Sequence, residues 1–504
     1  MEPRNVSVDG TDGLAKLEAD LARDFERLNH PPADWVPPRV GSDGRRMTDV
    51  LIVGGGMCGL AAAFALRRLG ISNLRHVDRS PEGREGPWRT YARMEVLRSP
   101  KHLTGPVLGL PGLTFRAWWE ARGNDWEGLG RIPRTVWMDY LDWYRRVTGA
   151  RIENGVGVVA LEPGARHEPA AGRGSGPGPG AGTGTAGVRV RLRNADGKGS
   201  LHARRVVLAT GREGQAAPRV PRPLAPFVGG PVLHSSQDID FAALRSRRVV
   251  VIGLAASAFD NAATALGAGA AEVVLVGRAP ALPRLNKMKQ TVYPGFTHGF
   301  PDLPDAEKLR LLDHVVRFRI APPRDSVLRI ASSPKARLML GTEILGATGH
   351  GDALRLETTK GALVADRVIL GTGFAFDLGA PRELAALSPE ILRWRDRVPE
   401  AKGEWGESPY LAPDFSFSPR AGSDIVGLER LHCFTHASQL SLGNLANDIP
   451  AVSEGAERLA RGIAASLYVE DREHHWERLR EYAEPELFGD EWPGLDTWWP
   501  PVSR

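Results

Sequence analysis

A glycine-rich turn between two apolar stretches constrains this chain more than any other feature. Residues 49–53 read Asp-Val-Leu-Ile-Val and predict a buried strand, the glycines break it at once, and residues 57–66 predict a helix. Such a turn aims the free N–H groups of the helix at a phosphate. Gly54, Gly56 and Gly59 stand at the three positions of a dinucleotide fingerprint. There they permit a tight turn, approach of the backbone to a pyrophosphate, and close packing of helix on strand.

The residues around this turn make the motif specific, since 58 glycines in 504 residues produce such spacings by chance. Residues 74–78 predict a second strand, and it ends in Asp78, 24 positions after Gly54. A carboxylate at that place bonds the hydroxyls of a ribose. The first unit therefore predicts a bound dinucleotide.

The overall composition is that of an ordinary globular protein, with 42% apolar and 25% charged residues and a length that suits two or three domains. The net charge of +5 is small and the basic residues are spread along the chain, so we expect no nucleic-acid partner. The two cysteines, Cys58 and Cys433, form no C-x-x-C pair. That argues against a disulfide framework, a structural zinc site and a dithiol reductase.

No segment of the sequence predicts export or membrane insertion. The N-terminus lacks a basic-then-apolar signal pattern. The longest apolar stretch, residues 249–276, is broken by Asp260, Asn261 and Glu272. We therefore expect a cytoplasmic enzyme with no membrane partner.

Two segments predict packing rather than chemistry. Residues 1–46 precede the first strand, and apolar residues at helical spacing over 14–28 predict one amphipathic helix on the outside of the body. Residues 115–144 are rich in aromatic side chains, most of which we expect in the core, with one or two at a pocket wall. The candidates for that wall are Trp118, Trp119 and Trp143.

The next segments predict a hairpin followed by a return to the sheet. Strands at 156–161 and 188–192 flank a tract of Gly, Pro, Ala and Thr, so we expect a disordered surface loop at about 168–187 rather than a domain boundary. The strand at 205–211 then re-enters a parallel sheet and stops at a small-residue turn.

The opening pattern is then repeated. Residues 248–260 again predict a buried strand that breaks into a helix, and the following strand, 273–278, ends in Arg278 rather than an acid. A guanidinium at that place suits the 2′-phosphate of NADP, although an exposed arginine at a strand end is the alternative. Ala255 stands where the second glycine belongs, so this unit departs from the fingerprint.

A charged and aromatic segment, residues 286–300, follows the second unit directly. We expect contacts with the nicotinamide and the substrate there, with Asn286 and His298 as candidate catalytic residues, although a lone histidine in a loop is more often a surface or hydrogen-bonding residue. The strand at 366–374 ends in a Thr-Gly turn, as the strand at 205–211 does. Because these endings bracket the second unit, we expect it to be inserted into the first.

The fold class that follows is α/β, with two Rossmann-like dinucleotide-binding domains, the second inserted into the first. The expected division is an N-terminal extension over 1–46, a first domain over 47–243 that resumes with the C-terminal tail over 362–504, and a second domain over 244–361.

With both nucleotide units, both Thr-Gly endings and the stretch Gly86-Pro87-Trp88, residues 48–470 resemble the single-component, class B flavin-dependent monooxygenases. The resemblance implies FAD on the first unit and NADPH on the second. The cofactor-binding positions that it implies are Gly54, Gly56, Met57, Cys58, Gly59, Asp78, Arg79, Trp88, Val158, Ala209, Thr210, Gly211, Asp448, Ile449, Gly253, Ala255, Ser257, Ala258, Arg278, Thr372 and Gly373. Cys58 has no partner thiol in the motif, and we interpret it as a small packing residue.

Within this family the chain looks most like the amine N-hydroxylases. Asp366-x-x-x-Leu370 followed by Gly-Thr-Gly-Phe is similar to their pattern, and residues 94–101 resemble their substrate side, where Lys101 would match a lysine. The Baeyer–Villiger branch fits less well, because Phe227 is one place too far from Gly230 and Asp238 replaces an aromatic.

The resemblance implies that NADPH reduces FAD and that a flavin C4a-hydroperoxide made from O2 oxygenates a small nucleophilic substrate, most closely an amine or amino acid at nitrogen. An amine must arrive unprotonated, and an apolar pocket favours that form. Baeyer–Villiger or sulfide oxygenation, an oxidase or reductase without oxygen insertion, and a nucleotide-sensing regulator are the alternatives. A homo-oligomer is possible.

The C-terminal part adds one more element to the expected flavin site. Residues 451–467 predict a helix that Asn447 or Asp448 caps, with Pro450 in its first turn. The positive end of that helix would stabilise the pyrimidine edge of a reduced flavin. The tail with Trp492, Trp498 and Trp499 predicts a packing strap.

Overall fold

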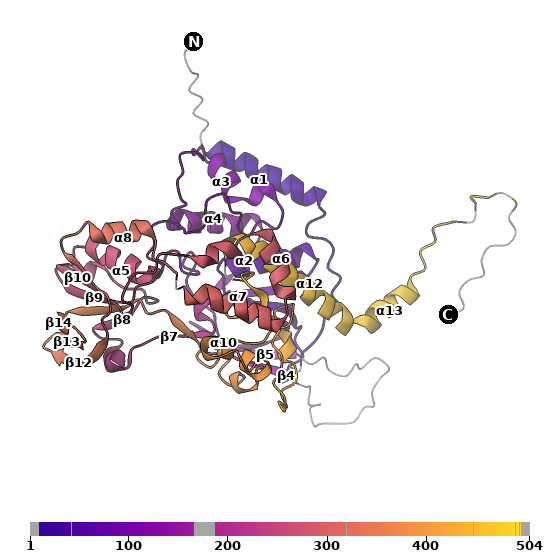
Figure 1. The fold of residues 1–504 in the computed structure, drawn as a ribbon. Coiled ribbons are helices and arrows are strands. Elements are labelled where there is room, and N and C mark those ends of the chain that lie inside the picture. The colour runs from indigo at the N-terminus through magenta and orange to yellow at the C-terminus, as the bar shows by residue number, and fades with distance from the viewer. Residues whose placement is uncertain are drawn as a thin grey trace, which may run out of the picture.

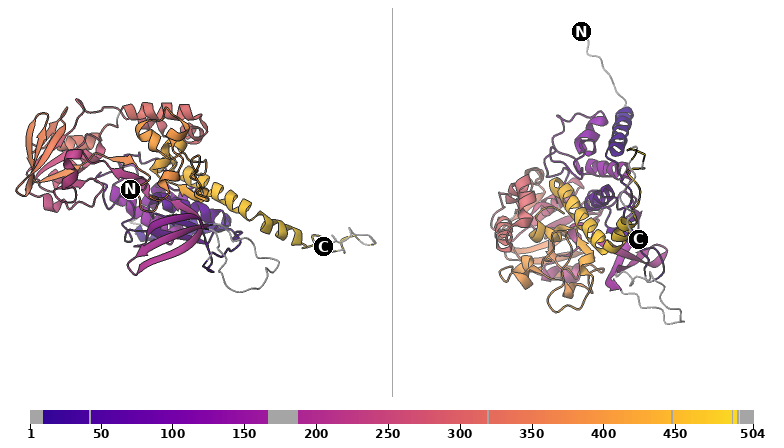
Figure 2. Two further views of the ribbon diagram at one scale, coloured as in Figure 1. Left: turned by 90° about the horizontal axis from the view of Figure 1, so that it is seen from below. Right: turned by 90° about the vertical axis from the view of Figure 1, so that its right-hand side faces the viewer.

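The computed structural model of the chain describes residues 10–41, 43–165, 187–318, 320–446, 448–488, 490–492 and 494. Two bodies lie side by side, a larger one around a seven-stranded sheet and a smaller one around a five-stranded sheet. Figure 1 shows the smaller body on the left and the larger one in the centre. Two further views show that the C-terminal helix α13, Arg472–Glu481, leads away from both (Figure 2).

The first sheet has the strand order β3-β2-β1-β6-β5-β4, with β17 beside β6. Its parallel part carries the predicted nucleotide unit, because β1, β2, β3, β6 and β17 run in one direction. The antiparallel hairpin of β4 and β5 extends it, as predicted. The strands are β1 Thr48–Val53, β2 Leu74–Asp78, β3 Glu153–Asn154, β4 Gly157–Ala165, β5 Gly187–Asn194, β6 Gly197–Leu208 and β17 Leu431–Cys433.

Helices cover one face of this sheet in two layers. The inner helix α2, Met57–Arg68, is buried from Gly59 to Leu66 and packs against α12, Val452–Glu470. The outer layer consists of α1 Gly10–Arg27, α3 Phe115–Ala121 and α4 Arg134–Val147. The helix predicted before the first strand is therefore confirmed, and its apolar side faces this layer.

The aromatic run over 115–144 is core, as predicted. Trp118 and Trp143 are buried in the same hydrophobic cluster as α2 and α12. Trp143 faces α1, because its indole N–H donates to Glu18 Oε1 at 3.0 Å. The expected pocket wall of Trp118 and Trp143 is therefore wrong, since both side chains are packed within the protein and neither is open to a ligand.

The second sheet is fully parallel, in the order β11-β10-β9-β15-β8. Its strands are β8 Val232–His234, β9 Arg248–Ile252, β10 Glu272–Val276, β11 Ala336–Met339 and β15 Arg367–Leu370. Helices α5, Ala256–Gly267, and α8, Arg324–Ala331, pack on each other beside it. An antiparallel sheet of β12 Ile344–His350, β13 Ala353–Thr358 and β14 Gly361–Ala365 lies next to it.

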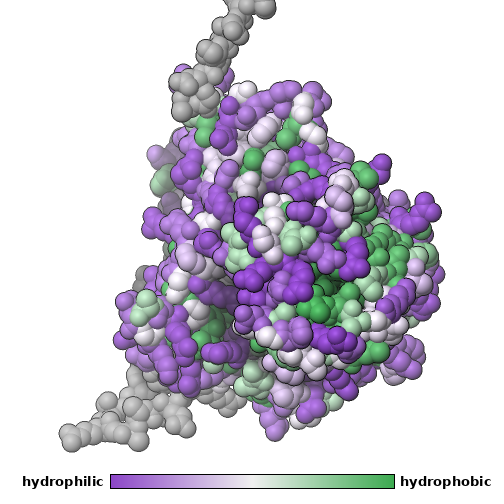
Figure 3. All heavy atoms as spheres, turned by 90° about the vertical axis from the view of Figure 1, so that its left-hand side faces the viewer, coloured by the Kyte–Doolittle hydropathy of each residue, from purple (hydrophilic) through white to green (hydrophobic). Residues whose placement is uncertain are grey.

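The side of the molecule that Figure 3 shows is largely hydrophilic, with one hollowed apolar area.

All strands of the second sheet lie in the sequence between β6 and β17 of the first. Strands β8 and β15 extend this body beyond the expected range of 244–361 on both sides. The chain crosses between the bodies in a two-stranded antiparallel ribbon of β7, Ala216–Pro218, and β16, Phe374–Phe376. These two connecting segments are therefore hydrogen-bonded to each other.

Helices that follow the second nucleotide unit return to the first body. The helices α6 Pro294–Gly299 and α7 Asp305–Arg317 share a hydrophobic cluster with the C-terminal part of the chain, which includes Phe300, Leu312 and Trp394. The remaining helices are α9 Trp394–Arg397, α10 Gly403–Glu407, α11 Gln439–Leu442 and α13 Arg472–Glu481. Among the described residues, no helix combines the length and the apolar character that crossing a bilayer requires.

Three predictions about a loop, a helix cap and the C-terminal tail are wrong or fall on residues outside the described ranges. The tract at 168–187 lies outside the described residues except for Gly187, which begins β5. Helix α12 follows a 3-10 turn, Ile449–Ala451, and Asp448 makes no capping side-chain hydrogen bond, so the predicted cap is wrong for Asp448, while Asn447 lies outside the described residues. The predicted packing strap is wrong at Trp492, which is 71% exposed; Trp498 and Trp499 are not described.

Candidate functional site

The turn between β1 and α2 requires two of its glycines for steric reasons. Gly54 has a φ of +111°, and a Cβ there would lie 2.4 Å from the carbonyl oxygen of Ala209. A Cβ on Gly59 would lie 1.9 Å from the carbonyl oxygen of Gly54. Gly56 differs, because a Cβ there would meet no atom nearer than Gly86 Cα at 3.8 Å. The turn thus leaves an open cradle at Gly56, where the N-terminus of α2 has no side-chain cap.

Asp78 lies at the end of β2 beside this cradle and is buried. Its carboxylate accepts hydrogen bonds from the N–H groups of Gly55, at 2.6 Å, and Ser80, at 2.7 Å. These bonds hold the carboxylate where the ribose is expected. Arg79 points outward and pairs with Glu213 at 3.2 Å, so it closes the same edge from outside.

His76 is a residue of this site that sequence reasoning missed. It lies on β2, and its Nε2 is 2.8 Å from the carbonyl oxygen of Gly54. Burial lowers the pKa of His76 to about 4, so the ring is neutral at neutral pH and Nε2 donates its proton to that oxygen. The available signal was a single titratable ring inside an otherwise buried strand. His76 therefore stabilises the turn through this hydrogen bond to Gly54.

Cys58 is a packing residue, in agreement with its interpretation from the sequence. Its thiol donates to the carbonyl oxygen of Ala446 at 3.2 Å. Burial raises its pKa to about 12, so it stays a neutral thiol. Met57 beside it packs against the same core.

The carboxyl end of β6 meets the cradle from the other side. Ala209 is buried against Gly54, and Thr210 and Gly211 follow it at the rim. Buried polar atoms without a hydrogen-bond partner among the described residues gather here: Thr210 Oγ1, Glu213 Oε1 and Gln215 Nε2. Orphaned polar atoms next to an open glycine cradle are what a dinucleotide would satisfy. The residues present therefore fit FAD.

The remaining expected FAD residues lie further along the same body. Trp88 contacts Trp137 edge to face, with ring centroids 6.5 Å apart, and Ile449 shares a core cluster with Trp137. Val158 is half-buried on β4. Burial raises the pKa of Asp448. The structure thus brings Trp88 and Ile449 to one region, between α4 and the start of α12.

The second turn, between β9 and α5, repeats the steric logic. Gly253 has a φ of +131°, and a Cβ there would lie 2.4 Å from the carbonyl oxygen of Gly371. Ala255 caps α5 and is exposed, so its methyl group stands at the mouth of the turn. Ser257 is half-buried, whereas Ala258 is fully buried against Gly371. The side chain of Ala258 therefore belongs to the packing and does not face a ligand.

Thr372 and Gly373 hold the crossing between the bodies together. The hydroxyl group of Thr372 donates to the carbonyl oxygen of Arg219. The carbonyl oxygen of Gly373 accepts the N–H of Arg219 at 2.9 Å and lies 3.1 Å from Nε2 of His234. These contacts place the Thr-Gly turn at the joint of β7, β8 and β16.

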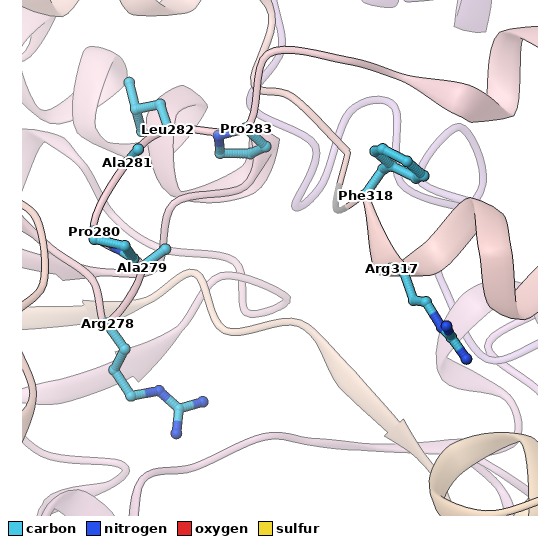
Figure 4. A pocket seen from close by; sticks show the side chains of 8 residues that line it. All are labelled: Arg278, Ala279, Pro280, Ala281, Leu282, Pro283, Arg317 and Phe318. Atoms are coloured by element: carbon cyan, nitrogen blue, oxygen red, sulfur yellow. The ribbon is translucent and has the colours of Figure 1, made fainter.

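Arg278 lies just beyond β10 and lines a pocket of about 590 Å³. Figure 4 shows its side chain extending into the open space, with Arg317 of α7 on the far side. Arg317 pairs with Asp313 at 2.5 Å. The pKa of Arg219 is lowered by desolvation and then by the charge of Arg278, so these two cations are neighbours. Two adjacent guanidinium groups at a strand end fit a phosphate group.

The three candidate catalytic residues are not brought together. Lys101 donates to the carbonyl oxygens of Trp126 and, at 3.3 Å, Glu127. Asn286 caps a 3-10 turn, where its Oδ1 accepts the N–H of Met288 at 3.1 Å. The first two side chains therefore have local structural partners.

His298 lies on α6, and its side chain is 62% exposed. Its Nδ1 is 3.6 Å from Oε1 of Glu454, in the first turn of α12. The contact joins α6 to α12. His298 thus lies on the surface between the two elements, away from the cradle residues.

Sequence reasoning missed two pairs of neighbouring cations, Arg93 with Arg134 and Arg98 with Arg212, which together we call the arginine cluster. Besides desolvation, the charge of Arg134 lowers the pKa of Arg93, and the charge of Arg98 lowers the pKa of Arg212. The two members of each pair therefore lie close together. Arg98 pairs with Asp260 of α5 at 3.0 Å, and Arg93 lies 3.8 Å from Asp238.

Arg134 and Arg212 differ from the other two members in having no carboxylate partner among the described residues. Arg134 donates to the carbonyl oxygen of Trp88. Desolvation lowers the pKa of Arg212, as it does for Arg134. His436 lies near Arg212, and burial followed by the charge of Arg212 keeps its pKa well below the usual value.

Comparisons with known proteins agree with this geometry. A family model described as FAD-NAD(P)-binding matches residues 51–213. The FAD-dependent urate hydroxylase of Xanthomonas campestris pv. campestris is 37% identical over 490 residues, which are 95% of this chain and 98% of that protein.

Solved structures share the fold. The ornithine hydroxylase of Pseudomonas aeruginosa has a TM-score of 0.61 at 20% identity, over 84% of this chain and 99% of its own. The L-lysine 6-monooxygenase of Pseudomonas syringae has a TM-score of 0.61 at 20% identity, over 83% of this chain and 99% of its own. With the sequence relative, the two glycine turns and the fold in agreement, the chain belongs to the flavin-dependent monooxygenase family, as an FAD-dependent oxidoreductase.

Proposed function

We propose that this enzyme uses NADPH and FAD to add one oxygen atom from O2 to a small, planar, anionic substrate such as urate. The observation that carries the proposal is the arginine cluster, in which Arg134 and Arg212 lack a carboxylate partner within the described part of the chain. The 37% identity to a urate hydroxylase supports it.

The charge of the arginine cluster favours an anionic substrate over an amine. Guanidinium groups that have lost part of their hydration gain a partner when an anion enters, and each charge-assisted hydrogen bond contributes about 1.5–3 kcal/mol. An ammonium ion would be repelled and would have to lose its proton before binding. The cluster therefore favours a deprotonated oxopurine over an amino acid side chain such as that of ornithine.

The residues have separate tasks in this proposal. Arg134 and Arg212 donate hydrogen bonds to the substrate oxygens and orient its ring. The cradle at Gly56 and the carboxylate of Asp78 hold FAD, which supplies the activated oxygen when it is bound and reduced. Arg278, with Arg219 beside it, binds the 2′-phosphate of NADPH. The neutral ring of His436 lies near Arg212 without adding charge.

The domain arrangement in this proposal follows the sheet order. FAD lies on the first body, and NADPH lies on the second, which is inserted between β6 and β17. The ion pair of Arg98 with Asp260 joins the substrate side of the first body to α5 of the second. Lys101, Asn286 and His298 act here as supports of their local structure.

A substrate panel tests the function. Purified protein that carries flavin is supplied with NADPH, O2 and, in turn, urate, L-ornithine, L-lysine, a ketone and a sulfide. We expect NADPH-dependent O2 consumption and a product one oxygen heavier with urate. Oxygenation of the amines alone would return the assignment to N-hydroxylation. NADPH consumption without oxygen insertion for any compound would make the enzyme an oxidase or reductase.

A further inference from the structure

Residues 84–98 of the first body, which we call the joint loop, contact the second body at several points. Arg84 pairs with Asp238, and Arg93 lies 3.8 Å from the same carboxylate. The guanidinium of Arg93 also lies over the ring of Phe241, 5.1 Å from its centroid. Asp238 and Phe241 belong to the segment between β8 and β9. The joint loop is therefore attached to the edge of the second body.

The end of the joint loop contacts two helices of the second body. Glu95 pairs with Arg329 of α8 at 3.0 Å. Arg98 pairs with one carboxylate oxygen of Asp260, on α5, at 3.0 Å. The hydroxyl group of Ser326, on α8, donates to the other oxygen of Asp260 at 2.6 Å. Both oxygens of this buried carboxylate thus have a partner, one from each body.

Asp260 depends on the first body for its charge partner. It lies in the middle of α5, where Phe259, Ala262 and Ala263 are buried in a hydrophobic cluster. A buried carboxylate costs free energy unless a cation pairs with it. Within the described part of the chain, Arg98 is the one cation that forms an ion pair with Asp260. The second body therefore gains a partner for its buried charge when it is docked as the structure shows.

This ion pair connects the two nucleotide turns. Helix α5, which carries Asp260, begins at the turn of Gly253 and Ala255. Arg98 lies near Arg212, which follows the Thr-Gly turn at the rim of the FAD cradle. A helix moves as a rigid element, so the position of Asp260 fixes the position of the N-terminus of α5. The ion pair thus sets where the second turn stands relative to the first.

The covalent connection between the bodies does not fix their angle. The chain crosses in the ribbon of β7 and β16, and each of these strands has three residues. A connection this short allows rotation, so the contacts between the bodies set the angle. Helices α6 and α7 provide one such contact through their hydrophobic cluster. The joint loop provides another, and it acts directly on the helix of the second nucleotide turn.

We propose that Asp260 is a positioning residue for the reduction of the flavin, because its ion pair with Arg98 sets the angle between the bodies at which a hydride passes from NADPH to FAD. This inference rests on the proposed placement of NADPH on the second body. NADPH is oxidised to NADP+, and FAD takes up the hydride and a proton. A hydride passes only between rings in contact, so a small rotation of α5 slows the step. The pocket at Arg278 keeps its own contacts with the coenzyme.

Anaerobic stopped-flow measurements of flavin reduction test the kinetic consequence, without any oxygenation substrate. Asp260→Asn keeps the hydrogen bond from Ser326 and loses the charge, and we expect reduction at saturating NADPH to slow at least about tenfold. The half-saturating NADPH concentration should stay within about twofold. Arg98→Met should have the same effect, with no further slowing in the double variant, whereas Arg98→Lys should keep most of the rate.

A distance between the bodies tests the structural consequence independently of NADPH. Burial raises the pKa of the native thiols, Cys58 and Cys433, to about 12, so spin labels attach to introduced cysteines. Leu28→Cys and Leu345→Cys place labels at exposed positions of the first and second body. We expect double electron–electron resonance to give one narrow distance distribution in the labelled parent, and a broader or shifted one with Asp260→Asn.

Arg337→Met is the matched control, because Arg337 pairs with Glu272 at 2.8 Å inside the second body. It should leave the reduction rate and the distance distribution unchanged. The flavin content of each variant reports that it is folded. If Asp260→Asn does not fold, Arg98→Met tests the same pair from its partly exposed side.

Each outcome decides the proposal. Unchanged reduction in both Asp260→Asn and Arg98→Met overturns it, and so does slowed reduction with an unchanged distance distribution. A raised half-saturating concentration at an unchanged limiting rate would assign Asp260 to coenzyme binding instead of positioning. A parent protein whose flavin NADPH does not reduce contradicts the proposed function. In that case the distance distribution still shows whether the ion pair holds the bodies at one angle.

Discussion

Replacing Arg278 by alanine should turn the enzyme's coenzyme preference away from NADPH. The side chain extends into the pocket beyond β10, and it forms no ion pair with another described residue that the substitution would break. A charge-assisted contact with a phosphate contributes about 1.5–3 kcal/mol. This corresponds to a change of about 10-fold to 150-fold in affinity.

The neighbouring charge sets which end of that range applies. Arg219 lies close to Arg278 and remains in the variant, but its guanidinium is engaged by Glu404 and by the carbonyl oxygen of Phe374 at 2.8 Å. Part of the positive field therefore persists. We expect a loss near the lower end, about 10-fold to 30-fold, in the apparent affinity for NADPH.

Steady-state kinetics with both coenzymes measure this change. Arg278→Ala should raise the KM for NADPH by that factor, leave the KM for NADH within about twofold, and leave kcat with saturating NADPH nearly unchanged, since the contact is equal in ground and transition states. Arg337→Ala, on the adjacent strand β11, is the matched control. Equal effects on both coenzymes would show that Arg278 does not bind the 2′-phosphate.

Three further predictions concern the first body. Arg212→Met should raise the KM for urate at least about tenfold and leave the KM for NADPH unchanged. The control is Arg189→Met, at an exposed position of β5. A raised KM for NADPH with an unchanged KM for urate would assign the cluster to the coenzyme phosphates. Gly59→Ala should abolish FAD binding, because its Cβ would lie 1.9 Å from the carbonyl oxygen of Gly54; a variant with full flavin content refutes that. Acid should destabilise the protein between pH 6.5 and about 4, where the unfolded chain binds the proton that buried His76 excludes, with a slope of at most about 1.4 kcal/mol per pH unit from this ring. Denaturant titrations should show this slope reduced in His76→Gln, and an unchanged slope would contradict the assignment.

The errors of sequence reasoning in the first body have a common cause. Trp143 was expected near a pocket, but its indole N–H bonds Glu18, which lies 125 positions earlier on α1. Helical spacing says that Trp143 lies on an apolar face, and it does not say which element covers that face. The predicted cap at Asp448 is wrong because a 3-10 turn separates that residue from α12. End geometry of this kind depends on how the preceding loop packs.

The sequence by itself determined the two nucleotide turns, because their requirement is local. A glycine with positive φ, or one against a carbonyl oxygen, tolerates no substitute, so the spacing of Gly54, Gly59 and Gly253 in the sequence is enough to recognise the turns. Only the tertiary structure decided the arginine cluster. Arg93 lies near Arg134, and Arg98 near Arg212, although about 40 and more than 100 positions of sequence separate the members of each pair. Charge acts through space, so no spacing in the sequence could reveal it.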